Sequence, residues 1–495
     1  MASPILHLTP LDFNFWNHTK DLVYEVEINT KGQLQKPVTD AANQIQQEDQ
    51  SHSKTSPCPA VYDAAAPQPR FGASPSGGAF LPAGETSAER AYVPTVGRWG
   101  WGAAVPPVAG VHYDIFINNN ADLYELIERT QIEGPWPIDH PLPLPRWASK
   151  PKDCYQLGSL TQYEKLAGSI EMHVQRLLEE HNYNTVGNFV DLYQNFKKSG
   201  YCTFFKFFQS YAPPITPDHH TCVGLALELW SRLHQLELHF PELSKHLFLV
   251  SCEENIEALS EYTALSERLD TAAYDLEKEH VLLCLRFQIN ERQGLLLCDP
   301  GYHVSRVVTV MQDRAYPNTG WFIQSEENNI CKEYNYQFSP MNDKFVEWNE
   351  RTTRNGIQEA FTGLIYVAHP YATAVDVTER RNLVYNFRSL LSRDQKGHLI
   401  AGIYFKVKEN CDEFTIFYQD MGKQRIKMKF STFTQPFEIK EKALNIITIC
   451  NEQLNLPEGS LLNILRQVGE LMNDKSYLRQ LLEVNDSVNI MSANN

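Results

Sequence analysis

The sequence lacks any apolar run that approaches the ~18 residues needed to span a bilayer. Its first residues, 1–10, also lack the basic region followed by an apolar stretch that marks a secretory signal. Both absences argue against a membrane partner and against secretion. We therefore expect a cytoplasmic protein, and a nuclear location is also compatible with the sequence.

Basic residues are in the minority. Lysine and arginine together number 44, against 60 aspartates and glutamates, so the formal net charge is -16. Proteins that bind nucleic acid usually present a basic face that displaces counterions from the phosphates. We therefore expect no nucleic-acid partner.

Cysteine pairs at metal or redox spacing are also missing. The ten cysteines occur singly, and none belongs to a C-x-x-C pair or to a dense disulfide framework. Most of them should be reduced. Asp218, His219, His220 and Cys222 offer metal-binding atoms, but adjacent histidines rarely point at one ion, so we expect no metal site.

The composition is that of a globular protein, with 42% hydrophobic and 11% aromatic residues among 495, enough for two or three structural units. Helical patterns followed by a series of strand patterns predict an α+β fold. A stretch rich in Pro, Ser, Gly and Ala cannot bury enough apolar surface to offset its ordering entropy. In chain order we expect a short ordered N-terminal segment that could bind a protein partner (1–30), a disordered linker (31–110), a thiol-enzyme-like core (111–330), a β-rich domain (331–440) and C-terminal helices (441–495).

Three local patterns define the expected core. Apolar residues at helical spacing predict a helix over 222–238, which begins at Cys222. Short apolar runs predict strands over 280–289 and 294–300, and the polar residues between them predict a hairpin loop. The order helix, strand, hairpin strand follows from these patterns.

The ends of these elements carry residues that could perform thiol chemistry. Cys222 opens the helix, where the positive end of the helix dipole favours a thiolate. His280 opens one strand and Asp299 closes its hairpin partner, so the hairpin brings those two side chains together. A thiolate nucleophile needs an imidazole to share its proton and a carboxylate to orient that imidazole.

The strings HHTCVGLALELW and EHVLLCLRFQINERQGLLLCDPG resemble the core of transglutaminase-like and arylamine N-acetyltransferase proteins. The resemblance covers roughly 159–321, and the strands over 400–430 look like the extra β domain of the acetyltransferases. It implies a papain-like core, a helix bundle packed on an antiparallel sheet, with an additional β-rich domain. It also implies that Cys222 accepts the acyl group, that His280 is its base and that Asp299 orients His280.

The resemblance leaves the substrates open. The acetyltransferases have an Arg-Gly-Gly run before their cysteine, whereas this chain has Asp218 to Thr221. Acetyl-CoA is one acyl donor that the resemblance implies, no bound cofactor is required, and an amine or a protein or peptide is the expected substrate. Oxyanion donors could be the amide of Cys222 and either Gln209 or Tyr211, although the sequence favours the reading of these last two as ordinary loop or edge residues.

Two hypotheses of different class follow. The first is an enzyme that forms a thioester at Cys222 and passes the acyl group to an amine or to water, as an N-acyltransferase, transamidase, deamidase or peptidase does. His303 is the second choice for the imidazole. The alternative is a catalytically inactive protein of papain-like fold that acts as an interaction scaffold or regulator.

Overall fold

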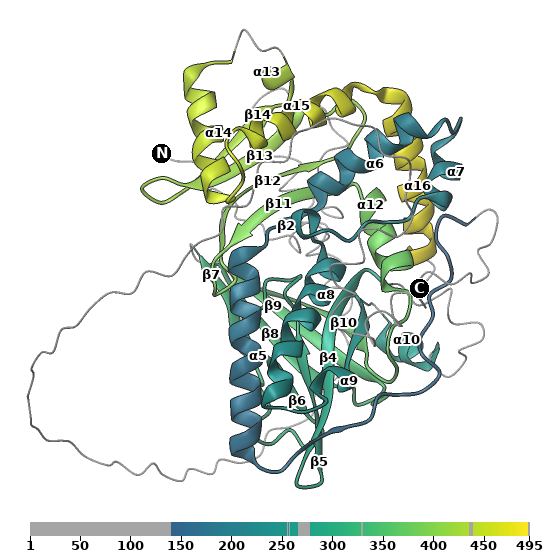
Figure 1. Cartoon of the computed structure of the whole chain (residues 1–495), viewed down its shortest axis with the longest axis vertical. Helices are drawn as coiled ribbons and strands as arrows, with labels where there is room; N and C mark the ends of the chain where they lie inside the picture. The colour runs from purple at the N-terminus through teal and green to yellow at the C-terminus, as the bar shows by residue number, and fades with distance from the viewer. Residues whose placement is uncertain are drawn as a thin grey trace, which may run out of the picture. The chain divides into compact units, whose positions relative to one another are not determined.

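The computed structural model describes residues 140–254, 256, 258–265, 278–327, 330–434 and 439–493, and these all belong to the compact unit Val105–Asn495 (Figure 1). The expected N-terminal segment at 1–30 and the expected linker at 31–110 lie outside the described residues. All structural statements below concern the described part of the chain.

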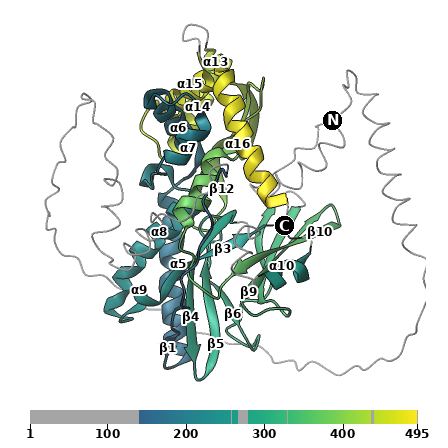
Figure 2. The same ribbon diagram turned by 90° about the vertical axis from the view of Figure 1, so that its right-hand side faces the viewer.

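A large, curled sheet carries most of the strands. Neighbouring strands are antiparallel, except that β1 runs parallel to β4. The sheet curls, so that β6 at one end of it contacts β8 near the other end (Figures 1 and 2). Along the sheet the order of strands is β6-β5-β4-β3-β10-β9-β8-β7. The strands are β1 (Tyr155–Leu157), β3 (Leu247–Glu253), β4 (His280–Ile289), β5 (Arg292–Cys298), β6 (Val308–Met311), β7 (Phe322–Glu327), β8 (Ile330–Phe338), β9 (Phe345–Arg354) and β10 (Ile357–Tyr366).

The β4–β5 hairpin confirms the strand pair expected from the sequence. Ile289 pairs with Arg292, so the turn consists of two residues, Asn290 and Glu291. Both have a positive φ, 48° and 68°, as a type I′ turn requires. Because this turn fixes the register, it also fixes which residues face each other at the far end of the hairpin.

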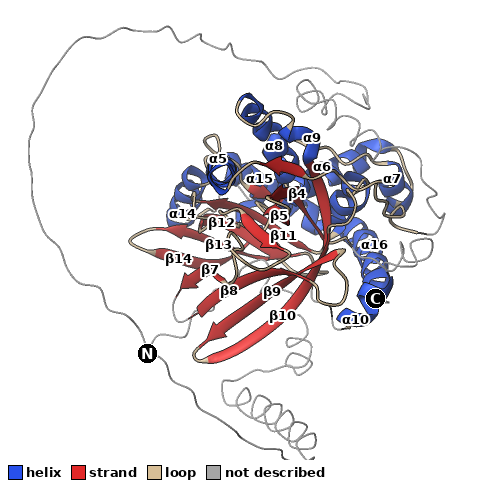
Figure 3. Ribbon diagram, turned by 90° about the horizontal axis from the view of Figure 1, so that it is seen from below, coloured by secondary structure: helices blue, strands red, loops and turns tan. Residues whose placement is uncertain are grey.

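Helices cover the face of this sheet near β4. The helix α8 (Cys222–Leu233) packs on β4, and α5 (Leu160–Glu180) packs on α8 (Figure 3). The buried residues of α8 include Leu225 and Leu229, which the helical spacing places on one face. The predicted helix therefore exists, although its last residues form the tighter turn η2 (His234–Leu238).

A smaller sheet follows in the order β14-β13-β12-β11-β2. Its strands are β2 (Tyr183–Asn184), β11 (Phe387–Arg393), β12 (Leu399–Lys406), β13 (Glu413–Gln419) and β14 (Lys423–Lys429). Helix α14 (Glu441–Gln453) packs on β12 and β13, while α6 (Thr185–Ser199) packs on β11. The remaining described helices are α7 (Phe204–Ser210), η1 (Pro217–His219), α9 (Leu243–His246), α10 (Leu259–Leu265), η3 (Ala374–Glu379), α12 (Arg380–Val384), α13 (Ser431–Thr434), α15 (Ser460–Asn473) and α16 (Lys475–Ala493).

The mixed α and β architecture agrees with the expected α+β class. The expected boundary at 330 falls inside the larger sheet, between β7 and β8, because β8 pairs with both β7 and β9. None of the helices in the described part of the chain combines the length and apolar character required to cross a membrane.

A buried ion pair lies between two adjacent strands of the larger sheet. Nζ of Lys332 on β8 is 2.6 Å from Oε1 of Glu350 on β9, and the two side chains are 3% and 2% exposed. The hydroxyl of Thr352 donates to the same carboxylate over 3.1 Å. Because water is excluded from this site, the two opposite charges stabilise each other.

The variant Lys332→Met should lower the free energy of unfolding by about 3–5 kcal/mol, because it leaves the Glu350 carboxylate buried without its counter-charge. Adding Glu350→Gln removes that charge and keeps an acceptor for Thr352, so the double variant should recover much of the loss. Urea unfolding of the three proteins measures the difference. Equal losses in the single and double variants would contradict this account of the pair.

Candidate active site

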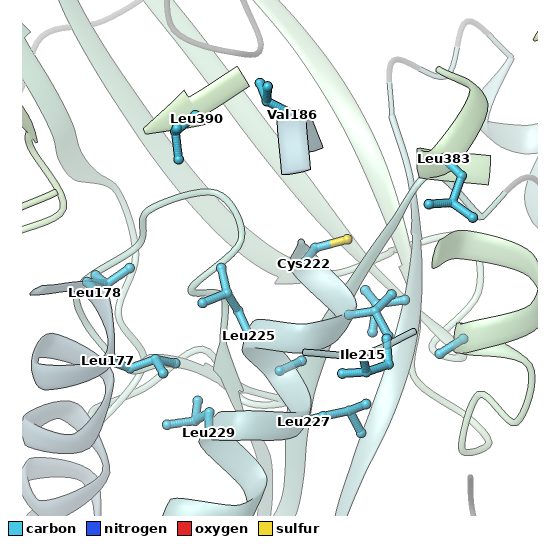
Figure 4. Close-up of a cluster of buried hydrophobic side chains, with 14 of the residues drawn as sticks. Leu177, Leu178, Val186, Ile215, Cys222, Leu225, Leu227, Leu229, Leu383 and Leu390 are labelled. Carbon is cyan, nitrogen blue, oxygen red and sulfur yellow. The ribbon is translucent and has the colours of Figure 1, made fainter. Parts of the chain in front are cut away.

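Cys222 is the first residue of α8 and is buried, with 2% of its surface exposed. Figure 4 shows its side chain at the start of the helix, with Leu225 and Leu229 on the turns that follow. The N-cap residue, Thr221, makes no side-chain bond to the helix, because its hydroxyl donates to Glu379 instead. The first amides of α8, and the positive end of its dipole, are thus directed at the surroundings of Cys222.

His280 and Asp299 meet at the end of the β4–β5 hairpin. Nε2 of His280 is 2.9 Å from Oδ1 of Asp299, and both residues are buried. A carboxylate at Nε2 leaves Nδ1 as the ring nitrogen that can exchange a proton with another group. The hairpin register therefore produces the imidazole–carboxylate pair that the sequence predicts.

Cys222 lies against the same imidazole. A Cβ atom added to Gly301 would be 2.6 Å from Cε1 of His280 and 2.8 Å from Cβ of Cys222, so both side chains border this glycine. Only a residue without a side chain fits there. The structure thus brings together Cys222 at the start of α8, His280 at the start of β4 and Asp299 directly after β5.

The electrostatics of the cluster favour a charged imidazole. Burial alone would lower the pKa of His280, but the charge of Asp299 and then that of Cys222, with hydrogen bonds to both, raise this pKa to about 10. The imidazolium is therefore the dominant form at neutral pH. An imidazolium placed beside a sulfur favours its thiolate form, as in other thiol nucleophile sites.

Tyr302 holds both members of the pair. Its ring stacks on His280 with centroids 3.7 Å apart and an angle of 15° between the planes. Its backbone N–H donates to Oδ1 of Asp299 over 3.0 Å. On its other side the ring stacks on Trp348 of β9. The orientation of the imidazole is consequently fixed by packing as well as by Asp299.

Two further residues at the site were not predicted from the sequence. Asn382 of α12 has Nδ2 3.6 Å from Sγ of Cys222. Glu379, at the end of the π-helical segment η3, is buried and accepts hydrogen bonds from Thr221 and, over 3.2 Å, from Nδ2 of Asn188. The run Thr378–Asn382 is polar throughout, which is typical of an exposed helix face, so no sequence signal pointed to its burial.

The expected oxyanion residues have other partners. Nε2 of Gln209 donates to the carbonyl of His140 over 3.1 Å. The carbonyl of Tyr211 accepts from Arg380, and its ring packs on Phe207. An oxyanion role for Gln209 or Tyr211 stays a prediction without a supporting contact.

The second-choice imidazole, His303, is engaged elsewhere. Its Nδ1 accepts a hydrogen bond from Nη1 of Arg393 over 2.8 Å. Burial and then the charge of Arg393 hold the pKa of His303 well below its usual range, so the ring is neutral. Within the described ranges, no group of three His, Cys, Asp or Glu side chains is arranged to hold a metal ion.

Comparisons with known proteins add little to this geometry. No protein-family model matches the chain, and no curated protein matches it. Among solved structures, an arylamine N-acetyltransferase from Nocardia farcinica matches 74% of this chain and 100% of its own, at 9% identity and a TM-score of 0.32. A likeness this remote carries no argument about activity, so the functional argument rests on the site.

Glu379 makes the site's stability depend on pH. Burial raises the pKa of its carboxyl from 4.5 to about 7, against the opposing effect of the Thr221 hydrogen bond. The folded state therefore holds this proton more tightly than the unfolded state does. The protonated carboxyl therefore contributes its full share of the free energy of unfolding below pH 4.5, the pKa of this group in the unfolded chain. That contribution is lost as the pH rises from there towards 7.

The variant Glu379→Gln cannot titrate and should escape this loss. The free energy of unfolding of the variant minus that of wild type should therefore increase from pH ~5 to pH ~8, by at most roughly 3 kcal/mol. Urea unfolding at the two pH values gives the difference. A gap between variant and wild type that does not change with pH would show that Glu379 is ionised in the folded protein throughout this range.

Proposed function

We propose that this chain is a thiol enzyme with a papain-like, transglutaminase-like core, which forms a thioester at Cys222 and transfers the acyl group to an amine or to water. The observation that carries the proposal is the cluster of Cys222, His280 and Asp299, buried together at a helix N-terminus. Each residue type stands where the chemistry of a thiol nucleophile needs it. N-acyltransferase, transamidase, deamidase and peptidase reactions all share this step.

The proposed reaction follows from the positions of the three side chains. The thiolate of Cys222 attacks the carbonyl carbon of the donor, a C–S bond forms, and the carbonyl π electrons move to oxygen. When the C=O bond re-forms, the bond to the leaving group breaks, and the imidazolium of His280 gives that group its proton. The amine or water then attacks the thioester carbon and gives a proton to His280, and as the new C–N or C–O bond forms the C–S bond breaks and returns Cys222 as a thiolate. Asp299 keeps the ring of His280 oriented throughout.

The acceptor is proposed to be an amine or a protein or peptide substrate, and acetyl-CoA is one acyl donor that would suit the reaction. The proposed reaction requires no bound cofactor, because the thiol and the imidazole supply the nucleophile and the proton transfers. The proposed place of action is the cytoplasm or the nucleus.

One observation favours a second candidate function. Cys222 and His280 are each only 2% exposed, so a substrate must reach a thiol that is almost fully enclosed. An inactive protein that keeps the fold and binds partners through its surface would not need access to this thiol. The reactivity of Cys222 separates the two candidates, because a scaffold has no use for an activated thiolate.

The test is alkylation by iodoacetamide at pH ~6, where ordinary thiols of pKa about 8.5 are almost fully protonated. The exposed Cys202 is the internal control, and peptide mass spectrometry reads every site. Cys222 should react at least about tenfold faster than Cys202 in spite of its burial, and His280→Ala should abolish that advantage. If Cys222 reacts no faster than Cys202, the scaffold function is the better account.

A further inference from the structure

Asn382 directs its side-chain amide at the sulfur of the proposed nucleophile. Nδ2 lies 3.6 Å from Sγ of Cys222, and Asn382 is buried. Asn382 belongs to α12, which directly follows the π-helical segment η3. Both segments are far from α8 in the sequence. Irregular helical segments of this kind often occur at functional sites.

The backbone that carries Asn382 is held from several sides. The fully buried Arg388 donates to the carbonyl of Asn382 over 2.7 Å and to that of Leu383 over 2.5 Å. Arg381 donates to Glu279 over 2.8 Å, and Arg380 donates to the carbonyl of Phe208 over 2.6 Å. Since these bonds fix α12, the amide of Asn382 needs little reorganisation to act on a bound group.

We propose that Nδ2 of Asn382 and the backbone N–H of Cys222 together form the oxyanion hole of the thioester reaction, an inference that rests on the proposed function. When the thiolate adds to a carbonyl, the new oxyanion stands two bonds from Sγ. A hydrogen-bond donor that lies close to the sulfur, as Nδ2 of Asn382 does, is therefore within reach of that oxygen. The backbone N–H of Cys222 lies at the positive end of the α8 dipole, which also favours the negative charge.

Two reactions of the same thiol test this role on the full chain. Acylation by p-nitrophenyl acetate passes through an oxyanion, whereas alkylation by iodoacetamide displaces iodide and forms none. Asn382→Leu removes the donor at nearly constant volume, and Asn386→Ala, two residues beyond the end of α12, serves as the control. The alkylation rate also reports whether each variant keeps a folded site with an active thiol.

Asn382→Leu should slow the burst of p-nitrophenolate about 100-fold or more, the usual effect of deleting an oxyanion donor, and leave alkylation within about threefold of wild type. Asn386→Ala should leave both rates unchanged. Equal losses in the two reactions would mean that Asn382 acts on the thiolate, and no loss in either would mean that it has no role; both results overturn the oxyanion assignment. A wild-type chain that is alkylated at Cys222 but never acylated overturns the proposed function itself.

Discussion

The hydrogen bond between Nε2 of His280 and Oδ1 of Asp299 sets the geometry on which the rest of the site depends. It exists because a two-residue turn fixes the register of β4 and β5 and so brings the ends of the hairpin together. Because Asp299 occupies Nε2, Nδ1 is the ring nitrogen left for another partner, and the charges of Asp299 and Cys222 raise the pKa of the buried imidazole. The helix dipole of α8 acts on the thiol at the same point.

The surrounding structure restrains this pair from both sheets. Tyr302 packs between the imidazole and Trp348 of the larger sheet. From β11 of the smaller sheet, the buried Arg393 donates to the carbonyl of Pro300 over 2.7 Å, and so anchors the loop that follows Asp299. Segments that are far apart in the sequence therefore fix the positions of His280 and Asp299.

The sequence predicted the parts of the site whose placement depends on local rules. Helical periodicity located the start of α8, and the strand–turn–strand pattern brought His280 to Asp299. Sequence could not reveal that Asn382 and Glu379 reach the start of α8, because their burial depends on packing between distant elements. The same reason explains why 330 was expected to end a domain, whereas β8 continues the sheet by pairing with strands on both sides.

If the proposed function is right, Cys222 carries an acyl group during the reaction. The direct test is incubation of the full chain with an isotopically labelled activated acetyl ester, followed by peptide mass spectrometry. One labelled acetyl group is expected on Cys222, which hydroxylamine removes as expected for a thioester and which is absent in His280→Ala. Label confined to lysines and other cysteines, with Cys222 unmodified, would contradict the proposed function.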